Sequence, residues 1–147
     1  MASNDLPSFP GPLPLTQARS ALRLTELADA AFTRDGPRAD VEYRDLHLDE
    51  ATDGRIGARH IRAIAPFERE TGWHWHDMSG HFVYVLHGWI AFRYAGVADE
   101  VVVRSGGCLS QPGGVAHNVV GRSDDLELIE LNLPARFGTW ELDGPTP

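Results

Sequence analysis

The sequence predicts an all-β fold, a barrel or sandwich of two sheets, with one α-helix near the N-terminus. Three observations indicate this class: short β-rich runs, closely spaced glycine-containing turns between them, and a single stretch with helical periodicity. A chain of 147 residues corresponds to one domain. A domain of this size buries about 68–70% of its unfolded-chain surface, so its core needs no covalent staple.

The charge balance and the cysteine count limit the partners and the compartment. The net charge is −8, the pI is near 5.2, and the 13 basic residues are scattered arginines, which argues against a nucleic-acid partner. A single cysteine, Cys108, cannot form an intramolecular disulfide and favours a reducing compartment. The sequence has no apolar run of about 20 residues and no signal-peptide pattern. We therefore expect a cytoplasmic protein without a membrane partner.

The N-terminal part divides into two segments. Residues 1–15 are rich in proline and predict an extended arm. Residues 16–36 carry an apolar stripe at helical spacing, with Thr16 as N-cap and Gly36-Pro37 as the stop signal. We expect this helix to pack on the outside of the barrel or against a partner subunit. Its stripe consists of Ala21, Leu24, Leu27, Ala28, Ala31 and Phe32.

Residues 38–135 predict the barrel, and residues 136–147 a C-terminal tail. Turn residues separate the β-rich runs, and such spacing is typical of two sheets that wrap together. The predicted strands are Val41–Leu48, Ile56–Ala65, His81–His87, Trp89–Tyr94, Glu100–Arg104, Cys108–Gln111, Asn118–Val120 and Leu126–Leu133.

Histidines cluster between residues 74 and 81. His74 and His76 are one residue apart, which in a strand puts both imidazoles on the same face. Asp77 then faces the other way, and the turn at residues 78–80 brings His81 back on a neighbouring strand. Imidazole is the commonest protein ligand for transition metals, so the pair forms half of a metal site. Spacing alone leaves open a second interpretation, two polar residues on a solvated strand face.

Two motifs in this region resemble those of the cupin family. The first family motif, G-x5-H-x-H-x3-4-E-x6-G, is matched by His74-x-His76-x4-His81-x6-Gly88. The second, G-x5-P-x-G-x2-H-x3-N, is matched by Gly106-x5-Pro112-x-Gly114-x2-His117. The resemblance covers about residues 41 to 133. It implies a double-stranded β-helix, or jelly-roll barrel, with one divalent metal in its lumen, often in a homodimer.

The chain departs from the family motifs at three positions. Glu68 replaces the first glycine, Gly121 replaces the final asparagine, and His81 stands where the family has a glutamate. The resemblance therefore implies a four-histidine metal site made of His74, His76, His81 and His117. Four neutral imidazoles leave the full charge on a divalent ion, which favours an anionic co-ligand. The ion is Fe, Mn, Ni, Co, Zn or Cu; four ligands would close a tetrahedral zinc site but leave two octahedral positions open.

A few further residues are candidates for the lumen. Strand parity from His81 points Val83 and Val85 inward. Gln111 is a candidate substrate contact if it faces inward, and Tyr84 and Glu70 are weak candidates for a general base. Among Arg59, His60 and Arg62 one side chain can reach the lumen and clamp a carboxylate, although a surface ladder is the preferred interpretation. His47 and His87 are expected on the surface.

These features favour a mononuclear metal-dependent enzyme that acts on a small oxyanionic or enolisable substrate. The reaction class is an oxidoreductase of the dioxygenase type or an isomerase/lyase. The alternatives are a non-catalytic module that binds a metal or small ligand, and a purely structural barrel.

Overall fold

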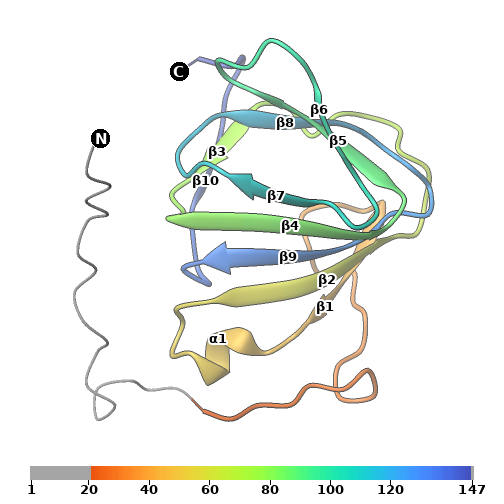
Figure 1. Ribbon diagram of the computed structural model, residues 1–147, viewed down its shortest axis with the longest axis vertical. Helices are drawn as coiled ribbons and strands as arrows, with labels where there is room; N and C mark the ends of the chain where they lie inside the picture. Colours follow the sequence, from red (N-terminus) through yellow and green to blue (C-terminus); the bar gives the residue numbers. More distant parts are fainter. Residues whose placement is uncertain (1–20, 147) are drawn as a thin grey trace, which may run out of the picture.

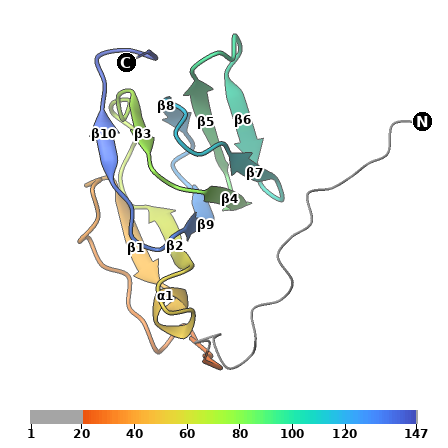
Figure 2. The same ribbon diagram turned by 90° about the vertical axis from the view of Figure 1, so that its left-hand side faces the viewer.

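The computed structural model describes residues 21–146, which form two five-stranded antiparallel sheets (Figure 1). The two sheets face each other, and the edge strands β6 and β7 lie on the same side of the molecule (Figure 2). Sheet A contains, in spatial order, β1 (Val41–Asp45), β2 (Gly57–Ala63), β9 (Glu127–Leu133), β4 (Gly80–His87) and β7 (Cys108–Gln111). Sheet B contains β10 (Thr139–Glu141), β3 (His74–His76), β8 (His117–Arg122), β5 (Trp89–Tyr94) and β6 (Val101–Arg104).

The predicted jelly-roll barrel is confirmed, because nearly all regular structure in residues 21–146 is β and every predicted run contains a strand. Three elements are absent from the predicted runs, and one of them is the short strand β3 (His74–His76) that carries the first two histidines. The first run ends early and is followed by a short helix, α1 (Leu48–Ala51), and the predicted tail contributes the strand β10. None of the helices in the described residues has the length and apolarity needed to cross a bilayer.

The predicted N-terminal helix is wrong over residues 21–36, and residues 16–20, like the arm at 1–15, lie outside the described part. Residues 21–36 contain turns and one isolated bridge, Thr33 to Tyr43, and run past α1 towards β1 (Figure 1). Leu24 and Leu27 are 74% and 71% exposed, so the apolar stripe has no surface to pack on. A short helix without tertiary packing is only marginally stable in water, and here Phe32 instead contacts His60 on the outside of sheet A.

The inward faces of the strands change from apolar to polar along the barrel. On β4 the order is Val85, Val83, His81, and on β9 it is Leu128, Glu130, Asn132. The paired strands repeat the change at the same end, because β-strand side chains alternate between faces. The corresponding pairs are Ile61 and Arg59 on β2, Leu109 and Gln111 on β7, Phe92 and Tyr94 on β5, and Val119 and His117 on β8. One end of the lumen is therefore hydrophobic core, and the other end is a polar site.

The turn of the second motif packs against the turn that connects β3 to β4. A Cβ atom on Gly113 would meet the Met78 carbonyl oxygen at 1.9 Å, so only glycine allows this approach. The neighbouring Gly114 N–H donates to the His76 carbonyl oxygen at 3.1 Å. These contacts hold the two motifs side by side.

A buried arginine ties the loop before β1 to the end of β8. The Arg122 side chain is 2% exposed, and its Nη2 donates to Asp40 Oδ2 at 2.8 Å and to the Ala65 carbonyl oxygen at 2.7 Å. Arg38 donates to the same carboxylate. Burial raises the pKa of Asp40, but the hydrogen bonds from Arg38 and Arg122 outweigh it and hold the pKa below its usual 3.8.

We expect Asp40→Asn to lower the free energy of unfolding at neutral pH by about 1–3 kcal/mol, because the buried Arg122 loses its charged acceptor. A carboxylate whose pKa is lower in the folded state stabilises the protein above its unfolded pKa and loses this effect as the pH falls through its folded pKa. The deficit of the variant should therefore shrink below pH 3.8, as measured by urea denaturation. Glu100→Gln, at the exposed pair with Arg93, is the control and should change stability by less than about 0.5 kcal/mol. A deficit that persists at low pH would contradict the interpretation.

Candidate metal centre

Three histidines converge at the polar end of the lumen. His74, His76 and His117 each offer a ring nitrogen, and these three nitrogens lie within 4.8 Å of one another. The pairing of β3 with β8 places His74 directly opposite His117, with ring centroids 4.4 Å apart. The His76 ring is 5.0 Å from that of His74 and 5.1 Å from that of His117. His117 is buried and the other two are half-buried, so the group is accessible from one side.

The Nδ1 atoms of these three histidines are already engaged. His74 Nδ1 lies 2.9 Å from the Gly72 carbonyl oxygen, and His117 Nδ1 lies 3.0 Å from the Val115 carbonyl oxygen. His76 Nδ1 lies 2.8 Å from Thr139 Oγ1 on β10. A carbonyl oxygen can only accept, so at His74 and His117 Nδ1 carries the proton and Nε2 keeps a free lone pair. This is the arrangement by which outer partners orient metal-ligating histidines.

His76 and His117 are also neutral at pH 7. Burial and the neighbouring histidines lower the pKa of His76 to about 4, and burial lowers that of His117 to about 4 as well. A histidine must be neutral to donate a lone pair to a metal. The residues present therefore fit a divalent transition metal at neutral pH.

His81 is oriented differently from the other three. Its ring lies near theirs, with its centroid 5.6 Å from that of His76, but it is not among the three whose nitrogens converge within 4.8 Å. Its Nε2 instead lies 3.2 Å from Glu130 Oε2 on the neighbouring strand β9. The structure thus brings together three of the four predicted ligands, and His81 lies beside them in contact with Glu130.

Polar side chains from five strands lie around His81. The Tyr94 hydroxyl donates to Gln111 Oε1 at 2.6 Å, and Gln111 Nε2 lies 3.5 Å from His81 Nε2. On the other side of His81, Glu130 Oε1 accepts a hydrogen bond of 2.8 Å from Arg59 Nη2. Burial raises the pKa of Tyr94, so its phenol stays protonated and remains a donor. Because His81 Nε2 cannot accept from the Gln111 amide while it donates to Glu130, two hydrogen-bonded groups lie side by side here: Tyr94 with Gln111, and His81 with Glu130 and Arg59.

Glu130 is held in its ionised form. Burial raises its pKa, but the hydrogen bond from His81 and the Arg59 guanidinium outweigh that effect and bring the pKa to about 2. Arg59 also lies over the Tyr43 ring, with its Cζ 5.0 Å from the ring centroid. The lumen therefore contains a fixed carboxylate next to the histidine group.

Of the other side chains predicted as candidates for the lumen, some face the lumen and others face the outside of the barrel. Gln111 is 4% exposed and faces the lumen, whereas Tyr84 is 45% exposed on the outer face of β4. Glu70 accepts a hydrogen bond from Asn118 on the outer side of β8. Neither Tyr84 nor Glu70 therefore lines the lumen as a general base.

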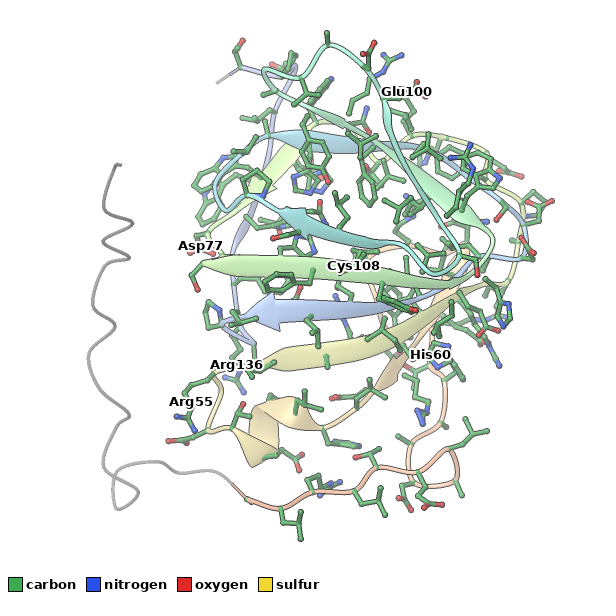
Figure 3. The ribbon with its side chains drawn as sticks, in the orientation of Figure 1. Arg55, His60, Asp77, Glu100, Cys108 and Arg136 are labelled. Atoms are coloured by element: carbon green, nitrogen blue, oxygen red, sulfur yellow. The ribbon has the colours of Figure 1, made fainter. Side chains whose placement is uncertain are left out.

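The basic residues of β2 divide between the two faces. Arg62 pairs with Glu42, and His60, labelled in Figure 3, pairs with Glu127; both lie on the outer face, as the surface-ladder interpretation predicted. Arg59 is the exception, because it faces inward and pairs with Glu130.

Two luminal residues, Glu130 and Asn132, were missed by the sequence analysis. Both share a face with the core residue Leu128, so alternation along the predicted strand Leu126–Leu133 was the signal that could have found them. Both residues were overlooked because they are polar, and polar residues on a strand usually face solvent. The remaining histidines lie outside the site: His87 is exposed, and His47 precedes α1 in a left-handed conformation.

A family model described as a cupin domain matches residues 60–132. The chain contains a cupin domain. The matched segment starts on β2, ends on β9 and includes His74, His76, His81 and His117. Among curated protein sequences, no match to the chain is found.

Solved structures with the same fold include three kinds of cupin-fold neighbour. KdgF from Halomonas sp. aligns with a TM-score of 0.62 and 15% identity over 79% of this chain and 96% of that one. The polyketide cyclase RemF from Streptomyces resistomycificus aligns with a TM-score of 0.64 and 17% identity over 83% and 86%. Oxalate decarboxylase from Bacillus subtilis, in a structure at pH 4.6, aligns with a TM-score of 0.59 and 14% identity over 84% of this chain and 34% of that one. At these identities the likeness shows the fold alone.

The observations together define what this cupin domain can do chemically. A group of three histidines can hold a metal ion, and the cupin-fold oxalate decarboxylase has Mn(II) centres. Beside this group lie an ionised carboxylate and a guanidinium that neutralise each other. The lumen can therefore hold a cation at one point and polar ligand groups next to it.

We expect Arg59→Met to lower the free energy of unfolding of the metal-free protein by about 2 kcal/mol, because Glu130 loses a charge-assisted hydrogen bond in the lumen. Adding Glu130→Gln should recover much of this loss, since it removes the uncompensated charge. Arg62→Met is the matched control on the outer face of β2, where Arg62 is 43% exposed against 31% for Arg59, and its pair with Glu42 should contribute at most about 1 kcal/mol. Chemical denaturation with a chelator present measures all four proteins. Equal losses for the two arginine variants would contradict the luminal placement of Arg59.

Proposed function

We propose that this protein is a mononuclear metal-dependent enzyme that acts on a small oxyanionic or enolisable substrate, with chemistry of the dioxygenase or isomerase/lyase type. The observation that carries the proposal is the convergence of the His74, His76 and His117 nitrogens, with each Nδ1 held by an acceptor or hydroxyl partner. A divalent metal bound there would supply a Lewis acid that stabilises negative charge on a substrate oxygen.

The charge of the lumen supports an anionic substrate. His76 and His117 are neutral and contribute no charge, and Arg59 and Glu130 cancel each other across 2.8 Å. An ion held by neutral ligands keeps its full positive charge and favours an anionic partner. His74 and His76 are only half-buried, which leaves the open side of the group accessible to a small molecule.

Glu130 acts in this proposal as a fixed hydrogen-bond acceptor. An efficient general base has a pKa near the working pH, and the pKa of Glu130 is about 2. Its role is to hold His81 and Arg59 in place and to accept hydrogen bonds from a bound ligand. In the described residues, the other charged group that faces the polar end of the lumen is Arg59. The proposal therefore assigns the activation of the substrate to the metal.

We expect His76→Ala to reduce the metal retained after dialysis at least tenfold, because one of three converging nitrogens is lost. His81→Ala should reduce it less, because the His81 Nε2 contacts Glu130 and not the histidine group. His87→Ala, an exposed histidine outside the site, is the control and should retain the wild-type metal content. Elemental analysis gives the metal-to-protein ratio, and circular dichroism confirms that the barrel, whose core is hydrophobic, stays folded without the ion.

The same comparison tests the four-histidine site that the sequence motif predicts. A loss for His81→Ala as large as that for His76→Ala would make His81 a fourth ligand. Unaltered metal content in His76→Ala, with saturation in the wild type, would place the metal elsewhere and overturn the proposed site.

We expect the metal-loaded protein to turn over at least one member of a panel of small diketones, thiols and sugars, and the chelated protein to turn over none. Parallel aerobic and anaerobic assays separate the two reaction types, because dioxygenase chemistry consumes oxygen and isomerase or lyase chemistry does not. Stoichiometric metal without turnover of any panel member would favour the non-catalytic binding module.

A further inference from the structure

One buried polar atom in the lumen has no partner. Asn132 is 2% exposed, and among the described residues its Oδ1 belongs to the few buried side-chain oxygens and nitrogens without a hydrogen bond. The other such atoms lie away from the polar end of the lumen and belong to Arg44, His47, Asp49 and Arg122. Burying an unpaired carbonyl oxygen costs about 1–3 kcal/mol, so a position of this kind calls for an explanation.

Asn132 lies beside the histidine group. It is directly opposite His81 in the pairing of β9 with β4, and the His81 ring is next to that of His76. The Asn132 Nδ2 points to Glu130 Oε1 at 3.5 Å, which leaves Oδ1 as the free acceptor. Exchanging the oxygen and nitrogen of the amide would set two acceptors against each other, so the hydrogen bond fixes the orientation.

The neighbouring carboxylate adds acceptor capacity at the same place. Glu130 Oε1 is contacted by Arg59 and Asn132, and Oε2 by His81. A carboxylate has about four lone-pair positions, so Glu130 can accept at least one more hydrogen bond. Asn132 Oδ1 lacks a donor, and Glu130 on the same face of β9 has room to accept one more hydrogen bond. A hydroxyl group supplies such a donor, whereas a second carboxylate would be repelled.

We propose that Asn132 and Glu130 form a subsite that binds a hydroxyl group of a small hydroxylated carboxylate or ketone, whose carbonyl or carboxylate oxygen faces the histidine group. The subsite selects hydroxylated ligands over their deoxy analogues, because an analogue without the hydroxyl leaves Asn132 Oδ1 unpaired. This inference rests on the proposed function in one respect, the placement of the ligand's carbonyl or carboxylate oxygen towards the histidine group.

The test measures dissociation constants by calorimetry for two matched pairs of probes, lactate with propionate and 3-hydroxybutyrate with butyrate. Each pair is titrated into the Ni²⁺-loaded and the metal-free protein. The measured quantity is the gain in affinity that the hydroxyl group provides. Any contribution from chelation of the metal by the hydroxyl is common to wild type and variants, and it cancels when their gains are compared.

In Asn132→Leu and Asn132→Ala, which both remove the acceptor, we expect the hydroxyl gain to fall about tenfold relative to the wild type. Asn118→Leu is the matched control. It removes another buried amide, 3% exposed, whose side chain bonds Glu70 and Thr71 on the outer face of β8, and it should keep the gain. Melting temperatures confirm that each variant is folded at the assay temperature.

Two results would overturn the subsite. One is an unchanged hydroxyl gain in both Asn132 variants, which would mean that a water or another residue satisfies the amide. The other is a wild-type protein that binds no hydroxylated probe more tightly than its deoxy partner. Failure of the metal proposal is distinguishable from both results. In that case the protein does not bind Ni²⁺, while titrations of the metal-free protein still show the gain in affinity from the hydroxyl group.

Discussion

The pairing of β3 with β8 is the constraint on which the site depends. These short strands come from the two motifs, and their register places His74 opposite His117. A shift of one residue would turn one of the two imidazoles to the outside of the barrel, because neighbouring residues on a strand face opposite ways. The register is supported from both sides, by the Gly113 turn packed on Met78 and by β10, whose Thr139 holds His76. Side chains from two motifs far apart in the sequence thereby reach a common point.

The barrel separates stability from chemistry along its length. At one end Val85, Leu128 and Ile61 form part of a dry core that needs no ligand. At the other end the same strands present charged and polar groups, which are stable there only because they pair with one another, as Arg59 does with Glu130. Removal of a metal should therefore leave the fold intact, and a substitution in the apolar half should lower the stability of the fold without removing any group from the site.

Strand positions and motif spacing were predictable from the sequence because both depend on local patterns. Short β-rich runs between glycine-containing turns identified the strands around Val83 and Phe92, and the spacing of the two motifs selected the histidines. The helix predicted over residues 16–36 is wrong in its described part, because helical spacing of leucines does not reveal whether a surface exists for them to pack on. Leu24 has none and stays exposed. The orientation of His81 could not be read either. It depends on Glu130, a residue 49 positions away that becomes its neighbour only when β9 pairs with β4.

Strand parity, the alternation of side chains between the two faces of a strand, predicts which residues line the polar half of the lumen. Once Leu128 is placed in the core, Glu130 and Asn132 must face the same way, and once Ile61 is placed, so must Arg59. What parity cannot give is the partner of each group. The free acceptor of Asn132 and the ionised state of Glu130 follow from contacts across strands, which only the folded structure contains.

Anomalous X-ray scattering from crystals of the metal-loaded protein tests the central claim most directly. The account predicts one strong peak in the lumen at coordination distance, about 2.0–2.2 Å, from the Nε2 atoms of His74, His76 and His117. A lumen without a peak, or a metal coordinated only by surface residues such as His47 or His87, would contradict it.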